Sequence, residues 1–155
     1  MGWLKLRISW RNFLHLPYIE KQLLGKVTIL LILIWLGLRL LSFHTLYSLL
    51  IRWGRNPSGP VNNDHTYQDQ VISAIHKVKR YLLGDNSCLT QALGGHFLLS
   101  RHGYQTHLRI GVQIDDKGKL HAHAWVESDG AVIIGGPVSE LEYYTPLPEL
   151  DGVRL

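Results

Sequence analysis

The residues of this chain that could carry chemistry are one thiol and two closely spaced histidines. Cys88 is the only cysteine, and His121 and His123 follow it in the segment His-Ala-His-Ala-Trp-Val-Glu at 121–127. A thiol beside an imidazole is an arrangement for nucleophilic catalysis, in which the thiolate attacks a carbonyl carbon and the imidazole moves the proton. We therefore expect Cys88 and one of the two histidines to form a reactive pair.

Cys88 is expected in the first turn of a helix that runs to about His102. Asn86 or Ser87 can cap the start of this helix, and Gly103 is positioned to end it. The N–H groups and the positive dipole end at a helix N-terminus favour thiolate over thiol, and they can hold an oxyanion. The position suits a nucleophile, although a lone cysteine is also common as a small buried hydrophobe.

A small antiparallel sheet is expected to carry the histidines. Apolar residues alternate with polar ones over 105–113 and 119–127, and a turn at 115–118 joins these runs as a hairpin. A third run at 131–136 returns after Asp129-Gly130, a strong signal for a tight turn. Alternation places both histidines on the polar face of the second strand.

The remaining elements complete an α+β fold. Asp64 can cap an amphipathic helix that Gly84 can close, because apolar residues recur between them at three- and four-residue spacing. Gly94 and Gly95 remove side chains from the cysteine helix below the thiol. We therefore expect a strand to pack closely against that helix.

Size and composition suit one globular domain in a reducing compartment. The chain has 155 residues, 46% of them hydrophobic and 18% charged, which is enough to bury a core. A single cysteine allows no internal disulfide, so a cytoplasmic location is expected.

Charge divides the chain into two parts. Residues 1–60 hold eight Lys and Arg residues and only one acid, Glu20, whereas residues 61–155 are net negative. We expect a basic, hydrophobic, helical segment over 1–60 and the catalytic domain over 61–155. Nucleic acid is not an expected partner, because the basic residues alternate with long aliphatic runs and form no polar stripe.

The apolar run at 27–51 allows three interpretations. A helix pair docked on the catalytic domain or a partner protein is favoured, with the Gly/Pro-rich residues 54–60 as a break after it. A peripheral membrane contact is the second interpretation. A true span is disfavoured, because Arg39 lies at the midpoint and residues 27–38 would cross only about 18 Å of a roughly 30 Å hydrocarbon core. No cleavage site typical of a signal peptide follows the run.

Several motifs together resemble the lasso peptide leader peptidase family of the transglutaminase-like cysteine protease superfamily. They are Cys-Leu-x-Gln-Ala at 88–92, Arg-His-Gly at 101–103, Leu-Arg-Ile-Gly-Val at 108–112, and Ala-His-Ala-Trp-Val-Glu at 122–127 followed by Asp129-Gly130. The resemblance covers roughly residues 65–135 and, more loosely, the leucine-rich segment at 38–43. It implies a papain/transglutaminase-like core.

The resemblance also implies an activity and partners. The activity is removal of the leader from a ribosomally made lasso peptide precursor, by a cysteine peptidase that needs no cofactor. The implied partners are the precursor peptide, a small leader-binding recognition protein and an ATP-dependent lasso cyclase.

The same resemblance assigns Cys88 as nucleophile and His123, in preference to His121, as general base. The family places an aspartate about a dozen residues after that histidine, where this chain has Gly135 and Gly136. Asp129 is a weak substitute, because six residues of extended strand separate it from the histidine by about 20 Å. A backbone carbonyl, another side chain or a different hairpin register are the alternatives for the third position.

Two other functions and a metal site are alternatives for these residues. The thiol and imidazole can instead transfer an acyl group to an amine, as transglutaminases do, or the chain can be an inactive scaffold that binds a partner or membrane. A zinc site is disfavoured, because no third histidine or cysteine has suitable spacing.

Overall fold

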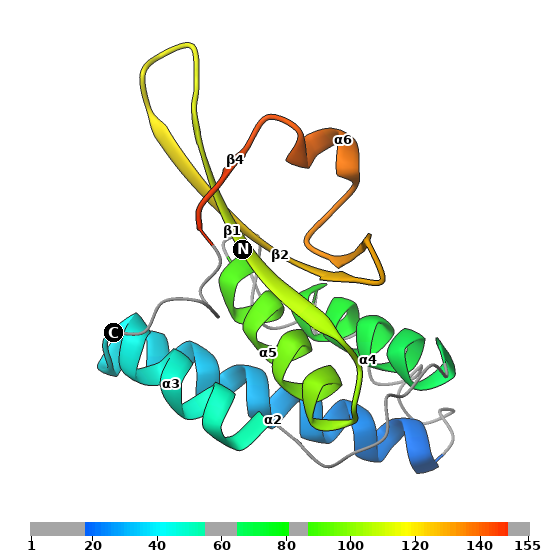
Figure 1. Ribbon diagram of the computed structural model, residues 1–155. Coiled ribbons are helices and arrows are strands. Elements are labelled where there is room, and N and C mark those ends of the chain that lie inside the picture. Colours follow the sequence, from blue (N-terminus) through cyan, green and yellow to red (C-terminus); the bar gives the residue numbers. More distant parts are fainter. Residues whose placement is uncertain (1–17, 55–64, 81–86, 149–155) are drawn as a thin grey trace, which may run out of the picture.

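The computed structural model describes residues 18–54, 65–80 and 87–148 (Figure 1). These residues form helices and one antiparallel sheet, so the predicted α+β class is confirmed. The helices are α2 (Tyr18–Leu40), α3 (Phe43–Gly54), α4 (His65–Val78), α5 (Cys88–Arg101) and the short α6 (Val138–Leu141). The strands are β1 (Thr106–Ile114), β2 (Leu120–Ser128), β3 (Ala131–Ile134) and β4 (Thr145–Pro146).

The four strands lie in the order β3-β2-β1-β4, and every neighbouring pair is antiparallel. The predicted β1–β2 hairpin is present, with Thr106 opposite Ser128 at one end and Ile114 opposite Leu120 beside the turn. Gly118 adopts a φ of 76° in that turn, a conformation that favours glycine. The hairpin extends well beyond the helices (Figure 1).

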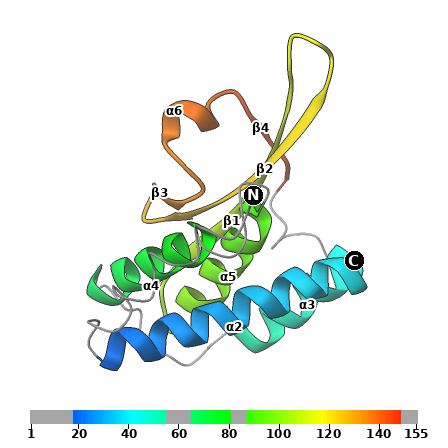
Figure 2. The same ribbon diagram turned by 180° about the vertical axis from the view of Figure 1, so that it is seen from behind.

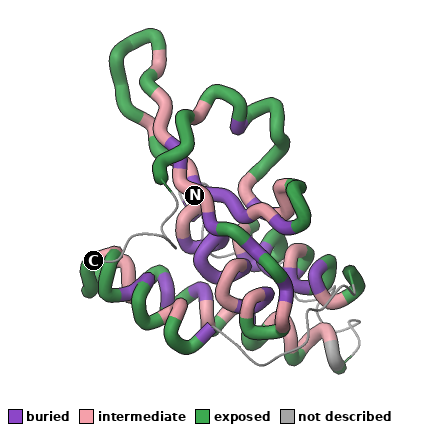
Figure 3. The backbone as a smooth tube through the Cα atoms, in the orientation of Figure 1, coloured by how far each residue is buried: buried purple, intermediate pink, exposed green. Residues whose placement is uncertain are grey.

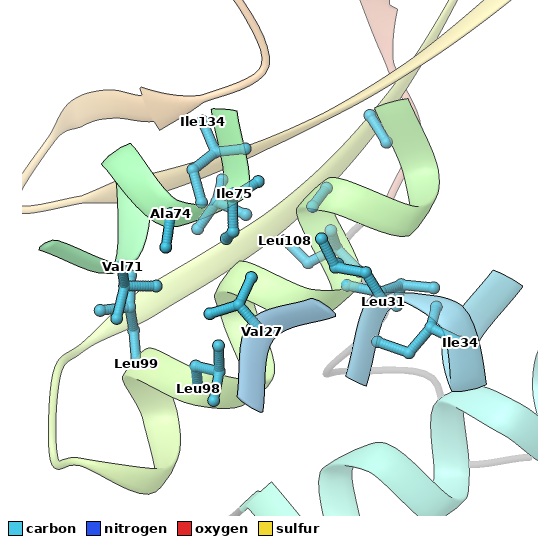
Figure 4. Close-up of a cluster of buried hydrophobic side chains, with 14 of the residues drawn as sticks. Val27, Leu31, Ile34, Val71, Ala74, Ile75, Leu98, Leu99, Leu108 and Ile134 are labelled. Carbon is cyan, nitrogen blue, oxygen red and sulfur yellow. The ribbon is translucent and has the colours of Figure 1, made fainter. Parts of the chain in front are cut away.

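Helix α5 is the centre of the molecule, because it contacts α2, α3 and α4 as well as β1, β2 and β3. The sheet lies on one side of α5, and α2 and α3 lie on the other (Figures 1 and 2). Buried residues accordingly concentrate along α5 and the parts of its neighbours that face it (Figure 3). Figure 4 shows side chains from these helices and strands meeting in one core.

Two adjacent glycines let other elements approach α5 from different directions. A Cβ atom on Gly95 would collide with the Ile134 side chain of β3, as expected from the sequence. A Cβ atom on Gly94 would instead collide with Leu31 of α2. The prediction of a close strand is therefore right for Gly95, whereas the neighbour at Gly94 is a helix that local sequence patterns do not indicate.

Helices α2 and α3 dock on the rest of the chain. Val27, Leu31 and Ile34 of α2 are completely or almost completely buried, and Leu46 and Tyr47 of α3 are also buried. This packing agrees with the favoured interpretation of the apolar run. The window at 20–40 is also long and apolar enough to cross a membrane by length and composition.

The start of α5 differs in one detail from its sequence-based description. Ser87 occupies the N-cap position of α5, but its side chain makes no capping hydrogen bond. Its hydroxyl oxygen instead accepts a hydrogen bond of 2.9 Å from Gln91 Nε2. At the other end, Gly103 has a φ of 85° and closes α5 as predicted. Asp64 and Gly84, the predicted ends of the preceding helix, lie outside the described residues.

Candidate active site

Cys88 is the first residue of α5 and its thiol is free and half-buried. Within the described residues, a backbone bond of 3.0 Å from Gln91 N–H to Ser87 O closes the first turn of this helix. The N–H groups of the first helical residues have no carbonyl partner inside their own helix and point toward its N-terminal end. A negatively charged sulfur or oxygen beside Cys88 would therefore lie at the positive end of the helix dipole.

His123 lies on the face of the sheet that does not contact the helical core. Ala124 and Val126 point into the hydrophobic core, so the odd-numbered side chains of β2 point the other way. On this outer face, the His123 ring stacks on Trp125 with centroids 6.4 Å apart. Its ring centroid also lies 5.4 Å from that of Tyr144. Two aromatic rings thus restrict the orientation of the imidazole.

A backbone carbonyl determines which nitrogen of His123 carries the proton. Nε2 lies 2.5 Å from the carbonyl oxygen of Gly135. A carbonyl oxygen can only accept a hydrogen bond, so Nε2 is the protonated nitrogen and Nδ1 keeps its lone pair in the neutral ring. Gly135 is the residue a dozen positions after His123, where the resemblance implies an aspartate. The sequence leaves open which group orients the imidazole, and in the structure the partner of His123 is a backbone carbonyl.

The position of this carbonyl depends on an irregularity between β2 and β3. Ser128 pairs with Ala131 and Glu127 pairs with Val132, as the turn at Asp129-Gly130 predicts, but Val126 then pairs with Ile134. A constant register from the turn would place Gly136 opposite His123, and this one-residue shift ends that register before it reaches the histidine. Beyond the shift, the backbone of Gly135 lies against Trp125, and its carbonyl oxygen accepts the hydrogen bond from His123.

Gly135 has a conformation and a neighbour that exclude any larger residue. Its φ is 122°, and an added Cβ atom would collide with the Cβ atom of Trp125. Gly136 has a similar φ of 111°, but its added Cβ would meet nothing closer than Glu140 Oε2 at 3.7 Å. An aspartate at position 135 would therefore collide with Trp125 in this arrangement.

Substitution of Gly135 tests this arrangement. Gly135→Ala is expected to lower the catalytic rate at least about tenfold, because displacement of the carbonyl releases the imidazole of the proposed base. Gly136→Ala has the same backbone strain without the collision and is the matched control, which should keep most of the activity. Gly135→Asp should do no better than Gly135→Ala, although it restores the family carboxylate. Equal rates for the two alanine variants in a peptide cleavage assay would contradict this role of the carbonyl.

His121 is engaged elsewhere. Its Nε2 lies 3.0 Å from Oδ2 of Asp115 in the hairpin turn. The hydrogen bond from His121, followed by those from the backbone N–H groups of Lys119 and Lys117, lowers the pKa of Asp115. His121 is thus held by Asp115 in the β1–β2 turn, whereas His123 is held by the carbonyl of Gly135. The structure distinguishes two histidines that the sequence places on one strand face.

The two residues of the expected pair lie on contacting elements but are not joined directly. Helix α5 contacts β2, yet within the described part of the chain no hydrogen bond joins Cys88 and His123. Catalytic hydrogen bonds are often long or poorly aligned in the absence of substrate. Because α5 packs on the core face of the sheet and His123 lies on the other face, this structure does not bring the thiol and the imidazole together.

A cavity of about 320 Å³ adjoins the imidazole. Its lining residues come from β1, β2, α6 and the segment after α6, and they are Gln113, His123, Glu140, Leu141, Tyr143 and Tyr144. The sequence analysis assigned no role to Glu140 or Tyr144. No motif marks them, and only their position after the Gly135-Gly136 turn brings them to His123.

Asp129 is a turn residue in the structure. It lies exposed in the β2–β3 turn with a φ of 51°, which agrees with its interpretation as a turn residue. Among the described residues, no group of three or more His, Cys, Asp and Glu side chains is arranged to hold a metal ion.

Comparison with known proteins places this geometry in a family. The model of the transglutaminase-like superfamily matches residues 30–149. The matched region includes Cys88, His123 and the cavity, together with part of α2 and all of α3. No match was found in the comparison with curated proteins or in the comparison with solved structures.

Proposed function

The chain belongs to the transglutaminase-like superfamily, and on this premise we propose that it is a cysteine peptidase that removes the leader from a lasso peptide precursor. The superfamily generally uses a cysteine nucleophile for peptidase or acyltransferase chemistry. The narrower assignment comes from the motifs around Cys88 and His123 that resemble the leader peptidases. The structural observation that supports a role for His123 as base is the hydrogen bond between its Nε2 and Gly135 O. This bond holds the proton on Nε2, so that Nδ1 has a free lone pair and can accept the proton of the thiol.

In the proposed mechanism, Cys88 and His123 act as nucleophile and general base. Nδ1 takes the proton from the Cys88 sulfur, and the thiolate attacks the scissile carbonyl carbon of the precursor. The N–H groups at the start of α5 stabilise the oxygen as it becomes negative. This step requires the Cys88 sulfur to come within hydrogen-bond reach of Nδ1 when the substrate is bound.

Collapse of the tetrahedral intermediate breaks the peptide bond. The imidazolium gives its Nδ1 proton to the leaving amine of the core peptide, and the leader stays on Cys88 as a thioester. Water then loses a proton to Nδ1 and attacks the thioester carbonyl. The leader leaves with a free carboxylate, the thiol regains its proton, and the core peptide has a free α-amine.

The proposed partners follow from this chemistry and from the resemblance. A leader-binding recognition protein presents the precursor to the peptidase. A lasso cyclase uses the core peptide whose α-amine has been released. The cavity beside His123 is wide enough for a side chain of the bound precursor and is lined by Glu140, Tyr143 and Tyr144.

The chemical fate of the leader tests the proposal. The protein, a precursor peptide and the recognition protein are incubated in water enriched in heavy oxygen, and the products are weighed by mass spectrometry. We expect a leader with one heavy oxygen in its new carboxylate and a core peptide of ordinary mass. A leader joined to an added amine would show acyl transfer instead, and an intact precursor would contradict the peptidase assignment.

A further inference from the structure

Helix α2 has two apolar faces, of which only one is used by the fold. Val27, Leu31 and Ile34 are buried against the rest of the chain. On the opposite side, a strip at i, i+4, i+7 and i+11 spacing remains in solvent, in which Ile29, Leu33 and Leu40 are 63%, 59% and 79% exposed. Leu36 completes this strip, which we call the outer strip of α2 (Ile29, Leu33, Leu36 and Leu40).

Helix α3 also exposes large apolar side chains. Leu49 and Trp53 lie one turn apart on this helix, and Trp53 is 68% exposed. Large apolar surfaces of this kind on a soluble domain mark sites that contact another molecule or a membrane. Tryptophan is also the side chain most characteristic of the boundary between lipid and water.

Basic residues flank the outer strip on both sides. Lys26 and Arg39 are exposed at its edges, and the guanidinium of Arg39 lies 4.7 Å from the centre of the Trp35 ring. The only acid in α2 and α3 is Glu20, which lies 4.0 Å from Lys77. The complementary surface is therefore apolar and negatively charged.

A phospholipid surface fits these properties better than a second copy of the chain. Anionic headgroups complement Lys26 and Arg39, while the acyl boundary accepts the strip between them. A symmetric dimer through the same strip would bring like charges from both copies together, at considerable electrostatic cost.

The packing of α2 also determines how it would meet the membrane. A spanning helix must expose all its sides to lipid or to other helices in the membrane, whereas Leu31 of α2 is packed against Gly94 of α5. A helix that keeps this contact can immerse only its outer strip. We propose that the outer strip of α2, with Trp53 of α3, binds the surface of an anionic phospholipid membrane while α2 stays docked on α5.

Such binding leaves the candidate active site in solution. Helices α2 and α3 lie on the side of α5 away from the sheet, as Figures 1 and 2 both show. The His123 cavity lies on the outer face of that sheet. A soluble precursor can therefore reach the cavity when the opposite side of the molecule rests on lipid. The membrane proposal does not depend on the peptidase activity.

Vesicle sedimentation tests the proposal with the full chain. Vesicles of equal parts phosphatidylcholine and phosphatidylglycerol should bind the protein, and binding should weaken in high salt and with phosphatidylcholine alone. Combined Leu33→Asp and Leu36→Asp substitutions should abolish binding. Lys26→Gln should weaken it about fivefold, the contribution of one basic residue near an anionic surface.

The matched control is Ile114→Asp, because Ile114 is 69% exposed but lies at the end of the hairpin, away from α2. This variant should bind like the unmodified chain, and circular dichroism should show that all variants are folded.

Equal vesicle binding by the Leu33/Leu36 and Ile114 variants would overturn the proposal, as would no binding by the unmodified chain. A dimer that only the Leu33/Leu36 change dissociates, without vesicle binding, would assign the strip to self-association. Resistance of the bound protein to alkaline carbonate would show a spanning helix instead.

Discussion

Cys88→Ala is expected to reduce leader release by about 10⁶-fold, because removal of a nucleophile eliminates the covalent pathway. Cys88 is half-buried at the start of α5, and the N-cap position of this helix belongs to Ser87. The free energy of unfolding should therefore change by less than about 1 kcal/mol. Cleavage of the precursor by mass spectrometry and thermal unfolding by circular dichroism measure the two effects separately.

A second readout depends on Cys88 being the only cysteine. Iodoacetamide should label the folded chain at one site and inactivate it. The precursor should protect Cys88 from labelling. Undiminished leader release by Cys88→Ala, or by fully labelled protein, would exclude Cys88 as the nucleophile.

His123→Ala is expected to lower the cleavage rate by about 10²- to 10⁴-fold, the range over which a general base contributes. His121→Ala is the matched control, because it removes the same side chain from the same face of β2. His121 contacts Asp115 in the hairpin turn, so its loss should affect the turn and leave the cleavage rate within about twofold. Initial rates of leader release from one precursor compare the two variants directly.

The reverse result would reassign the base. If His121→Ala were the inactive variant, the imidazole held by Gly135 would be structural and the hairpin turn would belong to the active site. Added imidazole gives a further criterion, because it should partly restore His123→Ala by entering the space between Trp125 and Tyr144. The same addition should leave Cys88→Ala inactive.

Much of the fold could be predicted because its signals are local. Alternating apolar residues and the glycine at 118 are sufficient for the β1–β2 hairpin, since strand period and turn conformation depend on neighbouring residues. The end of α5 before Gly103 follows in the same way from the preference for glycine after a helix. The start of α5 at Cys88 also agrees with the sequence, although the Ser87 side chain makes no capping hydrogen bond. The candidate nucleophile could thus be placed at a helix N-terminus from the sequence.

The surroundings of His123 could not be predicted, because they depend on contacts between distant residues. Its hydrogen bond to Gly135 lies beyond a one-residue bulge between β2 and β3, and no local pattern indicates a bulge there. Tyr144 reaches the ring only because the chain turns at Gly135-Gly136 and passes through α6. The close packing of α2 at Gly94 is a non-local contact of the same kind.

The sequence by itself therefore determined that the protein has a thiol at a helix N-terminus, histidines on a hairpin strand and a basic apolar segment before them. These features follow from residue type and from spacing along the chain. Only the tertiary structure decided that a backbone carbonyl orients His123, that Asp115 holds His121, and that α2 leaves one apolar face in solvent. Each of these depends on which distant groups meet when the core closes, because an imidazole or a helix face acquires its role from its partner.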